Sequence, residues 1–391
     1  MIADELACKL ANELVRPGCR VLDPFCGTGR TVLAAAERGA ECVAVDVNPL
    51  ASLVTRAKSA NPNMARLRDV LLCVQSRCVD GSRVRSLPRR LEVARRVRWF
   101  SGQCSRELFS LLDCLNDFEL KGDELTFVAA VLSATAREVS YCRDDQWKLH
   151  RLSPQARRRF FRSPHRVFER RLGIAMRDLG ECGSLKGSVQ TISADARILT
   201  QVLRDRRLQG KFDLVLTSPP YGDSRTTVQY GAMSAICLGV VRHLHGLDIA
   251  PISGGEIDRQ CLGGGSLSDL DTVATQAYWR GGRQNPARNR VARFVHDVEA
   301  CCEQLSATLG RGGRVVVVLA RRSVGGWRFA LDELFISTLE QLGVRLQWIQ
   351  RRQIQHKLTP SVINARSRAA GARPRRVSTM QEEWVLAFKK S

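Results

Sequence analysis

The sequence lacks the patterns that mark a zinc-binding, secreted or membrane protein. Its 14 cysteines include no Cys-x-x-Cys pair, and no signal peptide opens the chain, so neither a zinc ribbon nor a secreted disulfide framework is expected. No apolar run approaches the roughly 20 residues of a membrane-spanning helix, which excludes a membrane protein. We therefore interpret the cysteines as reduced, mostly buried side chains in a cytoplasmic protein that needs no metal.

Acidic residues are also scarce. The 391 residues include 39 Asp and Glu against 61 Lys and Arg, a formal net charge of +22. Such an excess predicts a polyanionic partner. Composition alone leaves one alternative open, a generally basic protein from a genome that favours arginine codons.

Seven short apolar segments alternate with helical patterns along much of the chain. This alternation predicts an α/β fold with a mostly parallel, Rossmann-like sheet whose ligand lies at the carboxyl ends of the strands. The expected strands contain CRVLD, ECVAVD, SVQTIS, KFDLVL, RGGRVVVVLA, VRLQWIQRRQI and EEWVLAFKK.

One long segment interrupts the alternation. We expect residues 1–59 to form the first part of the core, 60–186 a mainly helical insertion, and 187–391 the remainder of the core with a surface excursion at 222–300. The insertion contains basic clusters with interleaved aromatic residues, a composition suited to phosphates and bases. An amphipathic helical subdomain with solvated arginines is the alternative.

Two basic segments supply the candidate nucleic-acid contacts. The first lies within the insertion, and the second, ARSRAAGARPRRV, is expected to be a mobile loop able to touch phosphate. The candidate residues are Arg158, Arg159, Arg162, Arg373, Arg375 and Arg376.

The first motif is VLDPFCGTG, in which a strand delivers Asp23 and the chain then bends through Gly27 and Gly29. Glycine lets backbone amides approach a ligand, and the helix that follows directs its positive end at that ligand. Asp46, after the second strand, can accept both hydroxyls of a ribose, although a helix cap is the alternative role. Val32 replaces the third glycine of the dinucleotide fingerprint, which disfavours a nicotinamide enzyme.

The second motif is Thr217-Ser218-Pro219-Pro220-Tyr221, directly after the apolar strand FDLVL. Two consecutive prolines donate no backbone hydrogen bonds and hold the chain extended, so the carbonyl of Pro219 is expected to be a fixed acceptor.

Together these motifs resemble those of amino-group DNA methyltransferases of the Ser-Pro-Pro-Tyr type, bacterial modification enzymes dependent on S-adenosylmethionine (SAM). The resemblance implies the class I methyltransferase fold, a sheet with an antiparallel last strand. It also implies a nucleoid-associated enzyme that binds duplex DNA, with a cognate restriction endonuclease as a typical partner. The SAM contacts implied are Asp23, Phe25, Gly27, Thr28, Gly29, Asp46, Asn48 and, at the adenine, Asp195.

The catalytic residues implied are Ser218, Pro219, Pro220 and Tyr221. An exocyclic amine of a base is a poor nucleophile, because its lone pair is delocalised into the ring. Acceptors at the Ser218 hydroxyl and the Pro219 carbonyl would return that lone pair to nitrogen and stabilise its developing positive charge. Tyr221 offers a face on which a flipped base can stack.

The Ser-Pro-Pro-Tyr form is similar to cytosine-N4 enzymes, whereas adenine-N6 enzymes more often carry Asp or Asn instead of Ser. Cytosine-C5 enzymes need a Pro-Cys nucleophile, and the chain has no such dipeptide. An adenine-N6 enzyme, an RNA amino-group methyltransferase and a silent nucleic-acid-binding protein remain alternatives. Family members usually carry a Phe- and Pro-containing segment ahead of the first helix, and this chain starts too late to show it.

Overall fold

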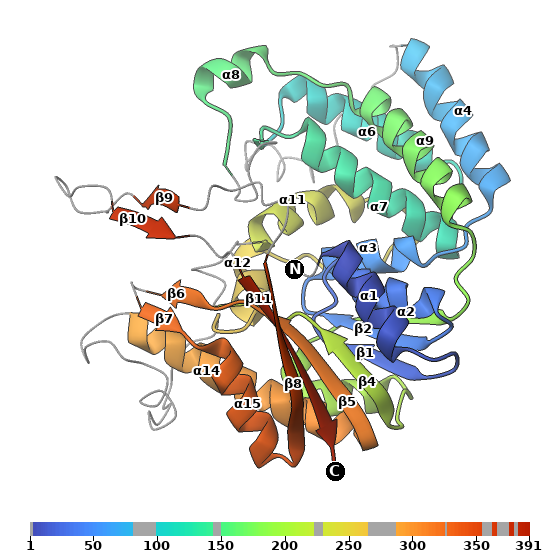
Figure 1. Ribbon diagram of the computed structural model, residues 1–391. Helices are drawn as coiled ribbons and strands as arrows, with labels where there is room; N and C mark the ends of the chain where they lie inside the picture. The colour runs from blue at the N-terminus through green and yellow to red at the C-terminus, as the bar shows by residue number, and fades with distance from the viewer. Residues whose placement is uncertain are drawn as a thin grey trace.

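The protein is built around one mixed seven-stranded sheet (Figure 1). The computed structural model describes residues 3–80, 99–143, 150–222, 230–264, 287–324, 327–353, 362–365, 375–378 and 382–391. The strand order is β3-β2-β1-β4-β5-β11-β8. The strands are β1 (Arg20–Asp23), β2 (Glu41–Asp46), β3 (Ser188–Ser193), β4 (Phe212–Thr217), β5 (Leu309–Leu319), β8 (Val344–Gln353) and β11 (Glu382–Lys390).

Strand direction confirms the expected fold class. The five strands β3, β2, β1, β4 and β5 pair in parallel, while β11 lies antiparallel to both β5 and β8. The central strands are nearly continuous apolar runs because both faces of the sheet are covered. Val315 to Leu319 of β5, for example, are all at most 1% exposed.

Alternate side chains of these strands enter two different hydrophobic cores. On one face, Val21, Leu214 and Val316 pack with α1 (Asp4–Leu14) and α2 (Arg30–Glu37). On the other face, Leu22, Val215 and Val317 pack with α10 (Leu199–Asp205), α14 (Ala287–Thr308) and α15 (Leu331–Gln341). The period of two along each strand therefore produces helical layers on both sides.

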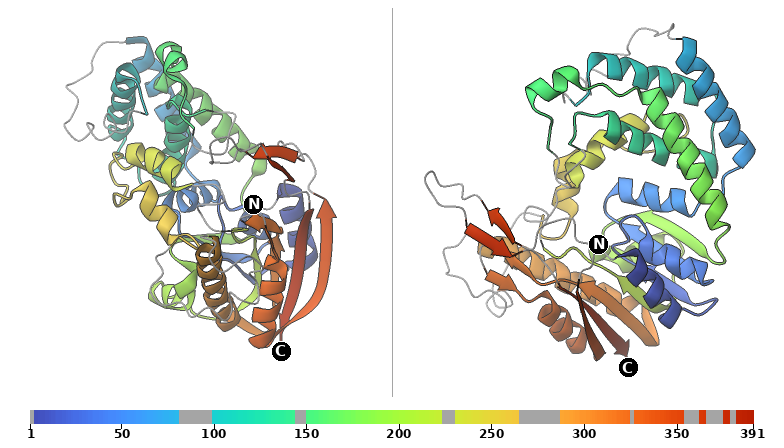
Figure 2. Two further views of the ribbon diagram at one scale, coloured as in Figure 1. Left: turned by 90° about the vertical axis from the view of Figure 1, so that its left-hand side faces the viewer. Right: turned by 45° about the horizontal axis from the view of Figure 1, so that its top comes forward.

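A helical unit with its own core lies beside the sheet at the side of α3 (Pro49–Lys58) (Figure 2). Its buried residues include Leu67, Leu111, Leu132 and Phe168. The helices are α4 (Met64–Asp80), α6 (Gly102–Asn116), α7 (Gly122–Val139), α8 (Pro154–Arg159), α9 (Pro164–Cys182), α11 (Gly231–Val241) and, beyond α11, the short α12 (Gly254–Gln260). Among the helices in the described part of the chain, none has the length and apolar content to cross a bilayer.

The segment 222–300, expected as a helix followed by a surface excursion, is packed into hydrophobic cores in two places. Helix α11 is part of the helical unit, because Val240 and Val241 are buried in its core. Residues 287–300 belong to α14, whose Val291, Phe294 and Val298 are buried against the sheet. The arginines that begin α14 obscure this apolar spacing in the sequence.

The basic segment between the last two main strands is not a loop throughout. Strand β9 (Val362–Ala365) pairs antiparallel with β10 (Arg375–Ser378), so Arg375 and Arg376 lie on a strand. A second small hairpin joins β6 (Arg322–Val324) to β7 (Trp327–Phe329). Sequence periodicity gave no sign of either pair, because segments of three or four residues are too short to show a periodic pattern.

Candidate functional site

The two sequence motifs meet at the carboxyl edge of the sheet. Strands β1 and β4 are parallel neighbours, with Leu22 opposite Val215, so both motifs begin at the same edge. The Thr217 hydroxyl donates to Asp23 Oδ1 at 2.6 Å, and the Thr31 hydroxyl donates to Asp23 Oδ2. A single buried carboxylate thus joins the strand before the glycine turn to the strand before Ser218.

The environment of Asp23 raises the pKa of its carboxyl group. The side chain is 1% exposed, and burial raises its pKa to about 6 even though Thr217, Thr31 and the Phe25 amide donate hydrogen bonds to it. A carboxylate removed from water gains from a nearby positive charge. The site is therefore electrostatically suited to a cationic ligand.

The glycine turn depends on conformations that only glycine adopts easily. Gly29 has φ +83° and directly precedes α2, and a Cβ there would lie 2.7 Å from Thr55 Cγ2. Gly27 has φ +53°, but a Cβ there would meet no atom within 4 Å. Gly29 is therefore required by packing, whereas Gly27 borders open space where a ligand can approach.

Around this turn, other groups fix the backbone. Thr55 donates to the Gly27 carbonyl at 3.0 Å, and Lys58 Nζ donates to the Thr28 carbonyl at 3.1 Å. Phe25 is half-buried against the core between sheet and α14. Sequence reasoning missed the roles of Thr31, Thr55 and Thr217, because threonine has no motif signature. The partners of Thr55 and Thr217 are also distant in the chain.

Asp46 lies beside the glycine turn and retains acceptor capacity. Its Oδ2 accepts from the Gly27 amide at 2.9 Å and its Oδ1 from the Asn48 amide at 2.8 Å. An ionised carboxylate offers about four lone-pair positions, so roughly two remain for hydroxyl groups. Burial raises the pKa of Asp46. Its alternative role as the cap of α3 is not what the structure shows, because Asn48 accepts from the Leu50 amide there.

Asn48 also connects the site to the helical unit. Its side-chain nitrogen donates to Ser234 Oγ of α11 at 2.9 Å. The residue therefore both ends the loop after β2 and fixes α11 against it.

Asp195 is more fully occupied. Each carboxylate oxygen accepts two hydrogen bonds from Arg197: the amide and Nε reach Oδ1, while Nε and Nη2 reach Oδ2. Arg197 also bonds Asp297 of α14 at 2.8 Å. An additional contact from Asp195 to a ligand would require Arg197 to release one of these acceptors.

Cys26 is not a nucleophile in this site. It is 6% exposed, and burial raises the pKa of its thiol well above the ordinary value. A thiol that remains protonated is unreactive. This agrees with its interpretation as a small packing residue. No group of three or more His, Cys, Asp or Glu suited to a metal ion occurs among the described residues.

The Ser-Pro-Pro-Tyr segment follows β4 with a hydrogen bond inside it. Ser218 Oγ and the Tyr221 hydroxyl are 3.0 Å apart, and either can be the donor. Ser218 is half-buried, Pro219 buried and Pro220 exposed. Tyr221 is 8% exposed and belongs to the core between sheet and α14, so its ring does not present an open face.

The candidate nucleic-acid residues differ in their exposure and in the contacts they make. Arg158 and Arg159, at the end of α8, are exposed. Arg162 instead donates to the Glu138 carbonyl at 3.2 Å and lies over the Phe160 ring. Arg375 and Arg376 lie on β10, and Arg373 lies outside the described residues.

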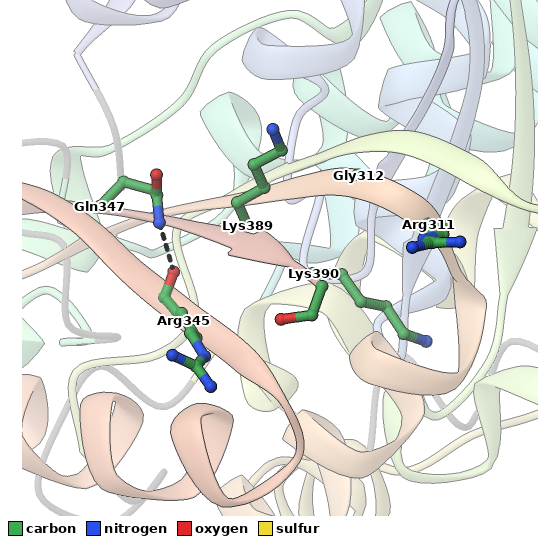
Figure 3. A pocket seen from close by; sticks show the side chains of 7 residues that line it. Arg311, Gly312, Arg345, Gln347, Lys389 and Lys390 are labelled. Carbon is green, nitrogen blue, oxygen red and sulfur yellow. Dashed lines mark hydrogen bonds between the residues drawn. The ribbon is translucent and has the colours of Figure 1, made fainter.

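A cavity of about 360 Å³ lies at the opposite, amino edge of the sheet, where β5 and β8 begin and β11 ends (Figure 3). Its lining is strongly cationic and comprises Arg311, Gly312, Arg345, Gln347, Lys389, Lys390 and Ser391. None of the motif residues lines it, so this cavity is separate from the site at the carboxyl edge.

Comparison with known proteins gives one extended similarity. No protein-family model matches the chain. The chain is 24% identical over 379 residues to the Type II methyltransferase M.MvaI of Kocuria varians, an alignment covering 90% of this chain and 81% of that protein. A 54-residue segment is 51% identical to magnesium-protoporphyrin O-methyltransferase of Rhodobacter capsulatus, covering 14% of this chain and 22% of that protein.

Solved structures are more distant. TrmN from Thermus thermophilus has a TM-score of 0.32 and 12% identity, covering 99% of this chain and 48% of that one. The rRNA methyltransferase AviRa from Streptomyces viridochromogenes has a TM-score of 0.31 and 12% identity, covering 99% and 85%. The strand order of this chain itself defines its fold class.

Proposed function

We propose that this protein is a SAM-dependent methyltransferase that methylates an exocyclic amino group in duplex DNA, with cytosine N4 as the target atom. The observation that carries the proposal is the contact between Asp23 and Thr217, because it holds the glycine turn and the Ser-Pro-Pro-Tyr segment at one sheet edge. The extended similarity to a Type II methyltransferase supports the same class.

The residues of the glycine turn fit the donor. SAM supplies an activated methyl group on a positively charged sulfur. The buried carboxylate of Asp23 matches that charge. The open space at Gly27 admits the ligand, and the free lone pairs of Asp46 suit ribose hydroxyls. The proposed SAM contacts are Asp23, Phe25, Gly27, Thr28, Gly29, Asp46 and Asn48, with Asp195 at the adenine if Arg197 gives up an acceptor.

At the second motif the protein would activate the amine. Ser218 Oγ and the Pro219 carbonyl would accept the two amino hydrogens, which orients the nitrogen lone pair towards the donor. Tyr221 would position Ser218 through their hydrogen bond. Stacking of a flipped base on Tyr221, which the sequence suggested, would first require its buried ring to become exposed.

Duplex DNA as the substrate is supported by charge. The net charge of +22 suits a polyanion, and the exposed Arg158 and Arg159 of α8 are the proposed phosphate contacts within the helical unit.

The test is transfer of label from methyl-labelled SAM to duplex DNA and, in parallel, to total tRNA. We expect label in DNA alone, and nucleoside mass spectrometry of the digested DNA should find N4-methylcytosine. N6-methyladenine would overturn the choice of base and keep the class. Label in tRNA alone would overturn DNA as the substrate. If calorimetry finds no SAM binding, the assignment as a SAM-dependent methyltransferase is overturned.

A further inference from the structure

Phe161 is an exposed aromatic residue that the chemistry described above does not use. It lies in the short link between α8 and α9, and its side chain is 43% exposed. Helix α8 lies at the outer edge of the helical unit, away from the seven-stranded sheet (Figure 1). A single exposed apolar residue is common in proteins, so its neighbours decide what it can do.

The residues on either side of Phe161 are held by contacts. The Phe160 ring packs edge-to-face against the Tyr141 ring, with the two centroids 6.0 Å apart. The guanidinium of Arg162 lies 5.2 Å over the Phe160 ring and donates to the Glu138 carbonyl at 3.2 Å. Because both neighbours are fixed, the exposed ring projects from a fixed backbone. A side chain on such a backbone loses less entropy when it binds a partner.

The beginning of the same segment is held at the same tyrosine. The Leu152 amide donates to the Tyr141 carbonyl at 2.8 Å, and the guanidinium of Arg157 lies 5.9 Å over the Tyr141 ring. Residues 152–162 therefore form an arm that is anchored at both ends and exposes Phe161 near its tip-side helix, α8.

The chain around Phe161 is strongly cationic. Residues 150–170 contain seven arginines and one acid, Glu169, which is half-buried and accepts from Gln75 at 2.8 Å. Exposed arginines of this segment that form no ion pair with another described residue are Arg158, Arg159 and Arg166. Cations of this density attract a polyanion, and an aromatic ring among them fits a polyanion that also has flat apolar faces. Nucleic acid has both features, because its bases lie between phosphates.

We propose that Phe161 is a base-contacting residue, whose ring stacks on a base of the bound DNA while Arg158 and Arg159 contact neighbouring phosphates. This inference rests on the proposed function, which makes duplex DNA the partner. Stacking within a duplex requires one base step to open, as apolar wedges in DNA-binding proteins do. Phosphate contacts depend steeply on salt, whereas an uncharged ring releases no counterions. The two kinds of contact are therefore separable by experiment.

The first experiment is fluorescence anisotropy with duplex DNA over a salt series. Phe161→Ala should weaken binding about tenfold at every salt concentration and leave the slope of log affinity against log salt unchanged. Phe161→Trp keeps an aromatic face and should bind like the wild type, whereas Phe161→Leu keeps apolar bulk alone and should bind like Phe161→Ala. The matched control is Ile174→Ala, a 40% exposed apolar residue on α9, which should retain wild-type affinity.

Three results of this experiment would overturn the proposal. They are wild-type affinity of Phe161→Ala, an equal loss for Ile174→Ala, and wild-type affinity of Phe161→Leu, which would mean that the ring is not needed.

The second experiment separates this inference from the proposed function. With p-azidophenylalanine in place of Phe161, irradiation should crosslink the protein to duplex DNA, and the same group in place of Ile174 should not crosslink. Crosslinking to total tRNA in preference to duplex DNA would overturn DNA as the partner of Phe161. Methyl transfer to DNA without any crosslink from position 161 would overturn the role of Phe161 and leave the proposed function intact. A crosslink to DNA by a protein that transfers no methyl group to DNA would support Phe161 and overturn the proposed function.

Discussion

The two edges of the central sheet carry opposite charges. At the carboxyl edge, Asp23 and Glu383 are at most 5% exposed and burial raises the pKa of both. At the amino edge, Arg311, Arg345 and Lys389 are exposed around a cavity. Two buried acids of a chain with a net charge of +22 thus lie at the edge where a cationic ligand is proposed to bind. Net charge indicates which partner the whole surface attracts. The ligand of the site is indicated instead by the buried groups around it.

The largest expected effect is on the rate of methyl transfer, after a change at the reactive end of the carboxyl edge. Ser218→Ala removes one of two proposed acceptors for the amine, and methyl transfer should fall about 10²- to 10³-fold. SAM affinity should stay unchanged, because Ser218 lies outside the glycine turn. The free energy of unfolding should fall by about 1 kcal/mol, because the buried Tyr221 hydroxyl loses its partner Ser218 Oγ. The control is Ser76→Ala, an exposed serine on α4 whose hydroxyl donates to the Cys73 carbonyl. Transfer at the wild-type rate by Ser218→Ala would refute the assigned chemistry.

The next effect separates packing from ligand access at the glycine turn. Gly29→Ala forces a Cβ against Thr55 at φ +83°, so we expect a loss of about 3 kcal/mol in the free energy of unfolding. Gly27→Ala, at φ +53° but in open space, should lose only about 1 kcal/mol. It should instead weaken SAM binding. Urea denaturation and calorimetry measure the two quantities, and equal losses of stability would contradict the distinction.

A third effect concerns pH and tests the burial of Asp23. Its pKa is about 6 in the folded protein and 3.8 in the unfolded chain, so the folded state binds the extra proton between these values. Stability should therefore fall as pH rises from about 4 to 6, by about 3 kcal/mol in total. Asp23→Asn cannot ionise and should lack this slope. Urea denaturation of both proteins across this range is the measurement, and parallel curves would show that Asp23 titrates normally.

The sequence predicted the local motifs well because each is set by adjacent residues. The strand before Asp23, the turn at Gly29 and the strand before Ser218 follow from apolar runs, glycine and proline. It did not predict the contact from Thr217 to Asp23, because that contact depends on strand order. It also misjudged α14, whose arginine-rich start hides the apolar spacing of the helix. It missed β10 because a four-residue strand is too short to show a periodic pattern.

The smallest effect compares exposed arginines from the two regions. If α8 contacts DNA, replacing Arg158 and Arg159 by Ala should remove about two phosphate contacts, and the slope of log affinity against log salt should become shallower by about 1.8. Arg345→Ala, at the amino-edge cavity, removes a positive charge far from the proposed contact and should leave the slope unchanged. Fluorescence anisotropy over a salt series measures both. A similar change in slope for Arg345→Ala and for the α8 variant would mean that DNA affinity depends on total charge. The proposed contact at α8 would then be refuted.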